Sequence, residues 1–416
     1  MPVKNQVHPH TKDFGVRVKI DELLTKGVEN IYPSREFLEK ALKSGKKLTI
    51  YQGFDPTANS LHIGHAVGLI KLKQFQELGH QVIFLIGDYT ALIGDPDKKS
   101  ARKPMTREEI MANCKDYQKQ AASILDFEGK NKVELKYNSQ WLSKLTFAHT
   151  LGLLTNFTVQ RMLERDLFEA RIKSGNPLYI HEFMYPVMQA YDCVSMEVDG
   201  EIGGNDQTFN MLAGRTLMKA MKNKEKFVLT TKLLIDSTGK KMGKTEGNMI
   251  TLSDSPKEMF GKIMSWPDTM IALGFELCTH ASMDAVRRIE KKLKDGKNPR
   301  DLKAELAREI ISIYYSMEEA KKSEQEFNKI FRDKDTPDQL DKVFIMENVE
   351  YNIADLIMLA NLSESKAQAK RLVEQGAVKL DKKAVKDWKS KIKPNDKTVL
   401  QVGKRKFAQL NYRDKT

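Results

Sequence analysis

Apolar residues recur at two different periods in the N-terminal half of the chain. Residues 47–54 are largely apolar and lead into a loop, and 81–88 form an almost continuous apolar run, as in a buried strand. Between them, the apolar positions of 62–78 follow helical spacing, and Gly79 ends that helix. This pattern predicts a strand, a helix and a second strand.

The alternation continues downstream. Thr106 and Glu109 have the spacing of a capping box, which predicts a helix from Thr106, and 132–139 has the pattern of another strand. Strands that alternate with helices predict a parallel α/β sheet of Rossmann type. Residues 151–192 are mostly helical in pattern, after which the sequence predicts a strand with a glycine turn (196–207) and a last strand (227–236).

The periodicity changes after about Asp254. Long charged, amphipathic segments predict a helical domain, and 333–342 has the composition of a linker. A small α+β unit follows, with a helix that ends at Gly376 and short strands over 377–381, 397–403 and 407–410. We therefore expect a catalytic domain with a helical insertion, a helical domain and a small C-terminal domain, at 1–254, 255–348 and 349–416.

Composition narrows the class of protein. The three cysteines, Cys114, Cys193 and Cys278, are far apart and form no CxxC motif, which argues against a disulfide scaffold or a zinc site. The N-terminus lacks the continuous apolar core of a signal peptide, and no run approaches the roughly 18 apolar residues of a membrane span. We expect a cytoplasmic protein.

The net charge of +13 suggests a polyanionic partner. Residues 351–416 contain 16 lysines and arginines against 7 acidic residues, so most of the excess lies there. A solubilising charged tail is the alternative, but apolar periodicity persists through this region, which favours a nucleic-acid-binding surface.

His62 and His65 lie one turn apart where the first helix begins, with Gly64 between them. Unpaired backbone N–H groups and the helix dipole make a helix N-terminus an anion site, and Gly64 lets a ligand approach the backbone. Two histidines at this spacing suit the phosphates of a nucleotide. The alternatives are helix capping or a core position, and H-x-G-H alone fits several nucleotidyl transferases.

Two neighbouring stretches strengthen the nucleotide hypothesis. Asp55 and Thr57 lie in the preceding loop, and Lys241 and Lys244 lie in the glycine-rich stretch 239–248. Such a lysine pair can stabilise the charge of a pyrophosphate leaving group. The basic stretch 97–103 is either a solvated loop or a second pyrophosphate clamp through its cations Lys98 and Arg102.

With these motifs the chain resembles the class I aminoacyl-tRNA synthetases, specifically the bacterial type of tyrosyl-tRNA synthetase. HIGH at 62–65 matches the first signature of the family, and KMGKT at 241–245 matches its second, K-M-S-K-S, with Gly243 and Thr245 in place of the serines. YQGFDPTANSLHIGH, GDYTALIGDP, YPVMQAYD and IGGNDQ carry the likeness further. The C-terminal unit is similar to an S4 RNA-binding domain.

The resemblance implies a role for each matching residue. It places the substrate phenol at Tyr51 and Asp192, the tyrosine amino group at Tyr185, Gln189 and Asp95, and the carboxyl group at Gln207. It implies that Thr57, His62, His65, Lys241 and Lys244 are catalytic, and that ATP contacts Gly53, Asp55, Gly64, Gly203, Asp206, Met242 and Lys244. In the C-terminal unit, we expect an RNA surface from Lys370 and Arg371 on a helix and Lys379, Lys382 and Lys383 on a hairpin.

The activity that the resemblance implies is that of a tyrosine–tRNA ligase, which forms tyrosyl-adenylate from ATP and tyrosine and then charges the 3′-terminal ribose of tRNA. Mg²⁺ should accompany ATP as part of the substrate, with no protein-bound metal or organic cofactor. The family also implies a homodimer, through the helical stretch around 150–170. A tryptophanyl-type synthetase, which has the same signatures, and a non-catalytic RNA-binding descendant are the alternatives.

Overall fold

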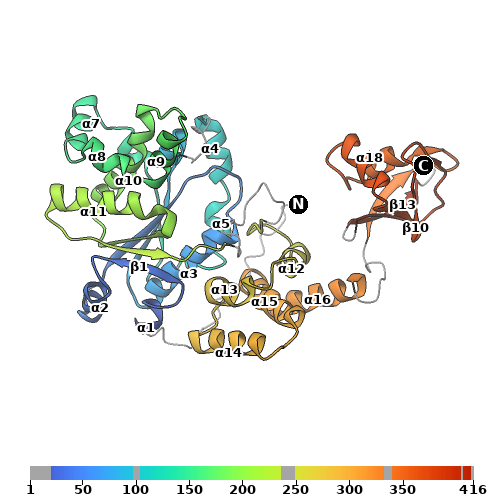
Figure 1. Ribbon diagram of the computed structural model, residues 1–416, viewed down its shortest axis with the longest axis horizontal. Coiled ribbons are helices and arrows are strands. Elements are labelled where there is room, and N and C mark those ends of the chain that lie inside the picture. The colour runs from blue at the N-terminus through green and yellow to red at the C-terminus, as the bar shows by residue number, and fades with distance from the viewer. Residues whose placement is uncertain (1–19, 97–103, 236–248, 332–339, 404–405, 414–416) are drawn as a thin grey trace. The chain divides into compact units, whose positions relative to one another are not determined.

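Two units make up the chain, Met1–Met317 and Glu318–Thr416. The computed structural model describes residues 20–96, 104–235, 249–331, 340–403 and 406–413 (Figure 1). Each unit has its own sheet and its own buried core.

A six-stranded sheet organises the first unit, in the order β1-β6-β5-β2-β3-β4. The strands are β1 (Val28–Tyr32), β2 (Thr49–Phe54), β3 (Gln81–Ile86), β4 (Glu134–Tyr137), β5 (Gly200–Gly204) and β6 (Phe227–Thr231). The five strands from β6 to β4 are parallel, as the sequence predicts. The order reverses between β2 and β5, and ligands of open α/β sheets bind at the carboxyl ends of the strands at such a point.

The edge strand β1 was not predicted and runs antiparallel to β6. Its VENIY sequence has only partly buried or exposed residues, so it lacks the continuous apolar run by which the parallel strands are recognised. The pairing with β6, about two hundred residues later in the sequence, is what makes it a strand.

Helices cover both faces of the sheet, because successive side chains of each strand point to opposite sides. Ile50 and Phe84 belong to the core that contains residues of α3 (Ile63–Glu77), whereas Tyr51 and Ile83 pack in a cluster with Cys193 of α10 (Ile180–Met196). The predicted helix α4 (Arg107–Cys114) has both hydrogen bonds of the Thr106–Glu109 capping box.

Of the remaining helices of this unit, those before Asp254 lie around the sheet (Figure 1). They are α1 (Ile20–Leu23), α2 (Arg35–Lys43), α5 (Tyr117–Ala121), α6 (Ser139–Leu142), α7 (Phe147–Leu154), α8 (Val159–Leu163), α9 (Asp166–Lys173) and α11 (Thr208–Lys222), with two short 3-10 turns at Thr90–Leu92 and Asn205–Gln207. The helices expected after Asp254 are α12 (Pro256–Met264), α13 (Met270–Cys278), α14 (Met283–Lys294), α15 (Pro299–Tyr314) and α16 (Met317–Phe331), which begins at the last residue of the first unit.

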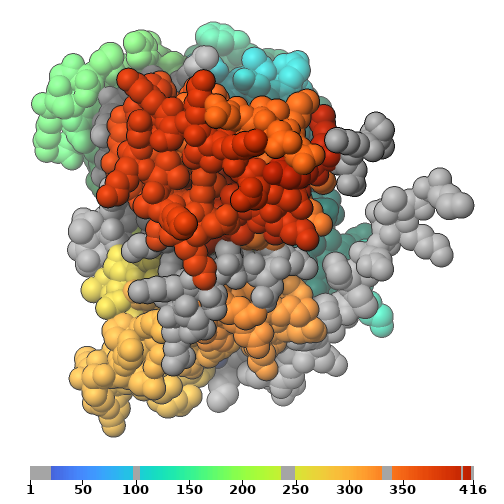
Figure 2. All heavy atoms as spheres, turned by 90° about the vertical axis from the view of Figure 1, so that its right-hand side faces the viewer, coloured from blue at the N-terminus to red at the C-terminus, as the bar shows by residue number. Residues whose placement is uncertain are grey.

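The second unit, orange to red in Figure 2, contains a five-stranded sheet in the order β10-β9-β12-β13-β7 and a two-stranded sheet, β11-β8. Its elements are β7 (Asp341–Ile345), β8 (Tyr351–Asn352), α17 (Ile353–Leu359), α18 (Lys366–Glu374), β9 (Val378–Leu380), β10 (Lys383–Ala384), β11 (Lys391–Ile392), β12 (Thr398–Val402) and β13 (Lys406–Tyr412). The expected helix before Gly376 and the three expected strands are confirmed.

One expectation for this region was wrong. The composition of 333–342 predicts a linker, but Asp341 and Lys342 begin β7, which pairs in parallel with β13. Charged residues at an edge strand look like linker sequence, and only the pairing with the last strand of the chain identifies them as sheet. The rest of that stretch, 333–339, lies outside the described residues.

Candidate functional site

A cavity of about 610 Å³ lies at the point where the strand order reverses. Every described residue that the sequence pointed to for tyrosine, ATP or catalysis lines it: Tyr51, Gly53, Asp55, Thr57, His62, Gly64, His65, Asp95, Tyr185, Gln189, Asp192, Gly203, Asp206 and Gln207. Five further predicted residues lie outside the described part of the chain: Lys98, Arg102, Lys241, Met242 and Lys244.

His62 and His65 cap the N-terminus of α3. His62 Nδ1 accepts a hydrogen bond from the His65 backbone N–H at 3.3 Å, and His65 Nδ1 accepts one from the His62 backbone N–H at 3.2 Å. The two rings stack, with centroids 3.7 Å apart. These two side chains therefore cap the helix and also line the cavity.

The cap determines the chemistry of His65. Burial, followed by the nearby His62, lowers the pKa of His65 to about 3, so its imidazole is neutral at physiological pH. A neutral imidazole that accepts at Nδ1 carries its proton on Nε2. His65 therefore has an N–H donor at Nε2 without bringing a positive charge.

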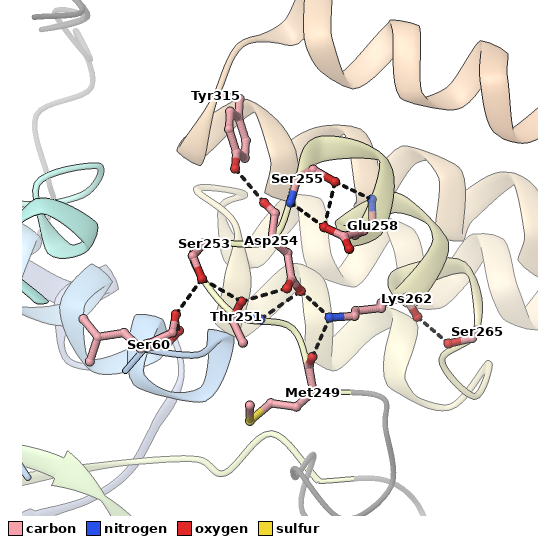
Figure 3. Close-up of polar contacts among 11 residues, drawn as sticks. Ser60, Met249, Thr251, Ser253, Asp254, Ser255, Glu258, Lys262, Ser265 and Tyr315 are labelled. Carbon is pink, nitrogen blue, oxygen red and sulfur yellow. Dashed lines mark hydrogen bonds and ion pairs between the residues drawn. The ribbon is translucent and has the colours of Figure 1, made fainter. Parts of the chain in front are cut away.

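The chain segment that follows residues 236–248 is held against this helix terminus. Ile63 N donates to Ile250 O at 2.9 Å, and Leu252 N donates to Leu61 O at 2.8 Å. Side chains add to this pairing, because the hydroxyls of Ser60 and Ser253 lie 2.9 Å apart (Figure 3).

Lys262 of α12 fixes the same segment from its other side. Its Nζ donates to Met249 O at 3.0 Å and forms an ion pair with Asp254 at 2.5 Å (Figure 3). Asp254 also accepts from the Thr251 hydroxyl at 2.7 Å. Met249, which lines the cavity, is thus tied to α12 through its backbone.

At the opposite end of the cavity the predicted phenol-binding residues are buried. Tyr51 Oη donates to Glu201 Oε1 at 2.6 Å and lies 3.1 Å from Cys193 Sγ. Asp192 accepts from Trp141 Nε1 at 2.7 Å and from Asn138 Nδ2 at 3.2 Å. Burial raises the pKa of Asp192 well above its usual value, and these two hydrogen bonds oppose the shift.

The three residues expected at the tyrosine amino group line one cavity but make separate hydrogen bonds. Tyr185 Oη donates to Asp55 at 2.8 Å, whereas Gln189 Nε2 donates to Glu201 at 2.9 Å. Asp95 forms an ion pair with Arg165 at 2.5 Å. It also accepts from Gln207 at 3.0 Å, so the residues expected at the amino and carboxyl groups are in direct contact.

Sequence reasoning missed several polar residues around the site, and four of them bear on its chemistry. Gln52, Asn138 and Glu201 line the cavity, and Arg165 pairs with Asp95. Gln52 Oε1 is buried and, within the described residues, accepts no hydrogen bond. Asn138 could have been predicted, because it lies at the end of the predicted strand 132–139. The sequence around Arg165 and Glu201 contains no motif that indicates a site residue.

The described residues contain neither a metal site nor a membrane helix. No three His, Cys, Asp or Glu side chains among them are grouped so as to hold a metal ion. None of the described helices has both the length and the apolar character needed to cross a membrane. Cys114, Cys193 and Cys278 are all buried free thiols.

In the second unit, the predicted RNA-binding residues occupy the expected elements. Lys370 and Arg371 lie on α18, whereas Lys379, Lys382 and Lys383 lie on the hairpin β9–β10. The three lysines of the hairpin are exposed. Lys370 Nζ lies 3.8 Å from the centre of the Trp388 ring, a cation–π contact.

Comparison with known proteins covers both units. A family model described as "tRNA synthetases class I (W and Y)" matches residues 43–332, and one described as "Tyrosine--tRNA ligase SYY-like C-terminal domain" matches residues 326–410. The tyrosine–tRNA ligase of Carboxydothermus hydrogenoformans is 43% identical over 94% of this chain and 97% of its own length. That of Thermotoga maritima is 42% identical over 94% and 96%.

A solved structure is also similar to this chain. The C-terminally truncated mitochondrial tyrosyl-tRNA synthetase of Coccidioides posadasii superposes with a TM-score of 0.60 at 26% identity, over 74% of this chain and 90% of that one.

Proposed function

Because the chain belongs to the tyrosyl-tRNA synthetases of class I, we propose that its cavity is the site where tyrosine is activated. The protein is a tyrosine–tRNA ligase: it joins tyrosine to the AMP part of ATP with release of pyrophosphate, and then transfers the tyrosyl group from AMP to the 3′-terminal ribose of tRNA. The observation that carries the assignment of the site is that the phosphate-binding motif and the predicted tyrosine-binding residues line a single cavity.

In the first step the tyrosine carboxylate attacks the α-phosphorus of ATP, and pyrophosphate leaves. The attacking carboxylate is already ionised, so the reaction needs no protein base, and catalysis consists of positioning and charge stabilisation. We assign the phosphates to the α3 N-terminus with Thr57, His62 and His65, and the rest of ATP to Gly53, Asp55, Gly64, Gly203 and Asp206. The neutral His65 has an Nε2 proton for a phosphate oxygen, as its Nδ1 is used by the cap.

Lys241 and Lys244 complete this assignment as the cations that stabilise the leaving pyrophosphate, with Met242 between them. Leu234 and Met249, which flank their stretch in the sequence, both line the cavity, and this supports the assignment. Lys98 and Arg102 are proposed as a second pyrophosphate clamp. Mg²⁺ enters with ATP as part of the substrate.

At the other end we assign the substrate phenol to Tyr51 and Asp192. Tyr185, Gln189 and Asp95 are assigned to the amino group, and Gln207 to the carboxylate. The buried hydroxyl of Tyr51 and the buried carboxyl of Asp192 support this order, because each has an oxygen that can accept a further hydrogen bond from a ligand hydroxyl. A site that hydrogen-bonds a hydroxyl rejects analogues that lack it, a principle for which this enzyme family is itself the standard example.

For tRNA, we propose that Lys370, Arg371, Lys379, Lys382 and Lys383 contact the phosphate backbone. We propose the domain limits 1–254, 255–348 and 349–416, with β7 (Asp341–Ile345) of the second domain pairing with β13 of the third. We also propose a cytoplasmic homodimer whose subunits meet near residues 150–170. Large apolar side chains exposed in and around this stretch support that interface: Phe147, Leu151, Val159, Ile172 and Ile180.

The assignment is tested by ATP–pyrophosphate exchange with tyrosine, phenylalanine and tryptophan supplied separately. With the three amino acids at the same low concentration, we expect exchange with tyrosine alone. Exchange with tryptophan would contradict the assignment of Tyr51 and Asp192, and a lack of exchange with all three would contradict the assigned activity.

A further inference from the structure

A fully buried ion pair lies behind the phenol end of the cavity. Lys226, the residue before β6, pairs with Glu201 of β5, and their side chains are 0% and 2% exposed. Lys226 Nζ also donates to Met211 O at 3.2 Å and to Cys193 Sγ at 3.1 Å. An ammonium has three N–H donors, so these three partners use all of them.

Glu201 connects this ammonium to the cavity. One carboxylate oxygen faces Lys226, and the other accepts from Tyr51 Oη at 2.6 Å and from Gln189 Nε2 at 2.9 Å. Glu201 itself lines the cavity, as do Tyr51 and Gln189. The pair therefore orients two side chains that we assign to the substrate.

The direction of the Tyr51 proton follows from these contacts. A phenol has one O–H, and in Tyr51 it points to Glu201. The hydroxyl can therefore accept a hydrogen bond from a ligand but has no proton left to donate to one. Burial, with smaller contributions from Cys193 and Glu201, raises the pKa of Tyr51 well above its usual value and keeps this hydroxyl neutral.

A helical glycine leaves room for the pair. Gly214 is in the interior of α11, where glycine destabilises a helix relative to alanine. A Cβ atom at this position would lie 2.6 Å from Cys193 Sγ and 2.8 Å from Lys226 Nζ. Buried ion pairs are themselves weak sources of stability. A helical glycine and a buried ion pair, neither of which favours stability, therefore occur together here, and this indicates a role other than stability.

We propose that Glu201, held by Lys226, is a positioning residue for substrate selection: it turns the Tyr51 proton away from the cavity, so that this end accepts a hydrogen bond from a para-hydroxyl donor. The proposal rests on the assignment of tyrosine to this cavity. It predicts selection for a ligand that donates, over phenylalanine, which does not.

The test is a neutral replacement of both partners, Lys226→Met with Glu201→Gln, compared with Glu201→Gln alone. The single variant leaves a buried ammonium without its carboxylate, so its melting temperature should fall; the double variant should melt close to the wild type. In the double variant, the side-chain amide introduced by Glu201→Gln can either donate to or accept from the Tyr51 hydroxyl. The direction of the Tyr51 hydroxyl proton is therefore no longer fixed.

We expect the ratio of kcat/KM for tyrosine to that for phenylalanine, measured by pyrophosphate exchange, to fall about tenfold in the double variant, since one oriented hydrogen bond is lost. The KM for ATP should stay within about twofold, because the phosphate end is untouched. A ratio that stays within twofold of the wild-type value, in a folded double variant, would overturn the proposal. A wild-type protein that fails to exchange with tyrosine would instead overturn the proposed function.

The chain offers a matched control. Arg171 and Glu182 also form an ion pair with side chains 0% and 2% exposed, and neither residue lines the cavity. Arg171→Met with Glu182→Gln should leave the tyrosine-to-phenylalanine ratio unchanged. An equal fall of the ratio in this control would show a general effect of losing buried charge and would also overturn the proposal.

Discussion

The two ends of the cavity are built in different ways. The phosphate end consists of a helix terminus and a pair of stacked histidines from one short stretch of sequence, and its backbone at Gly64 is exposed. The phenol end is buried and joins residues of β2, α10, β5 and the start of β6. Backbone N–H groups can bind a highly charged ligand where they are partly accessible, whereas recognition of one hydroxyl requires fixed, desolvated partners held by several elements.

The largest expected effect separates the two ends. His65→Ala removes the Nε2 donor from the phosphate end, so adenylate formation should slow by about 100- to 1,000-fold, while tyrosine affinity stays within about twofold. Pyrophosphate exchange and equilibrium dialysis with tyrosine measure the two quantities. A large loss of tyrosine affinity in His65→Ala would contradict the assignment of the phosphates.

For Asp192→Asn we expect the reverse, a loss of tyrosine affinity without an effect at the phosphate end. Trp141 and Asn138 both donate to this side chain, and an amide has only one oxygen, so one donor would face an NH₂ group. We expect tyrosine affinity to weaken by about 10- to 100-fold, with the KM for ATP unchanged. Asp88→Asn, at a buried carboxylate outside the cavity lining, is the matched control. An altered KM for ATP in Asp192→Asn would show that the two ends are not independent.

The smallest effect is a pH dependence of stability at the phosphate end. The pKa of His65 is lowered to about 3, so the unfolded chain binds this proton first as the pH falls below about 6.5. Stability from the neutral imidazole is therefore complete above about pH 6.5 and is lost as the pH falls toward 3.

Urea unfolding of the wild type and His65→Gln at pH 7.5 and 5.5 measures this contribution. The difference in free energy of unfolding between the two proteins should shrink by about 1.4 kcal/mol at the lower pH. A difference that stays constant would mean that His65 is not held neutral by the fold.

Patterns within one element were predictable from the sequence. The helix α3 with its histidines and the capping box of α4 both follow from short-range spacing. The edge strands β1 and β7 were not predictable, because a strand at a sheet edge is defined by its partner rather than by its own hydropathy.

The motifs, the alternation of strands and helices, and with them the family and the chemistry at the phosphate end could be read from the sequence. The contact of Glu201 with both Lys226 and Tyr51, and the ion pair of Arg165 with Asp95, became visible in the folded chain. The physical reason is that spacing along one helix or strand fixes the neighbours of a residue within that element. The pairing of charges from different elements depends on which strands the fold brings side by side and on which face of the sheet each side chain points to.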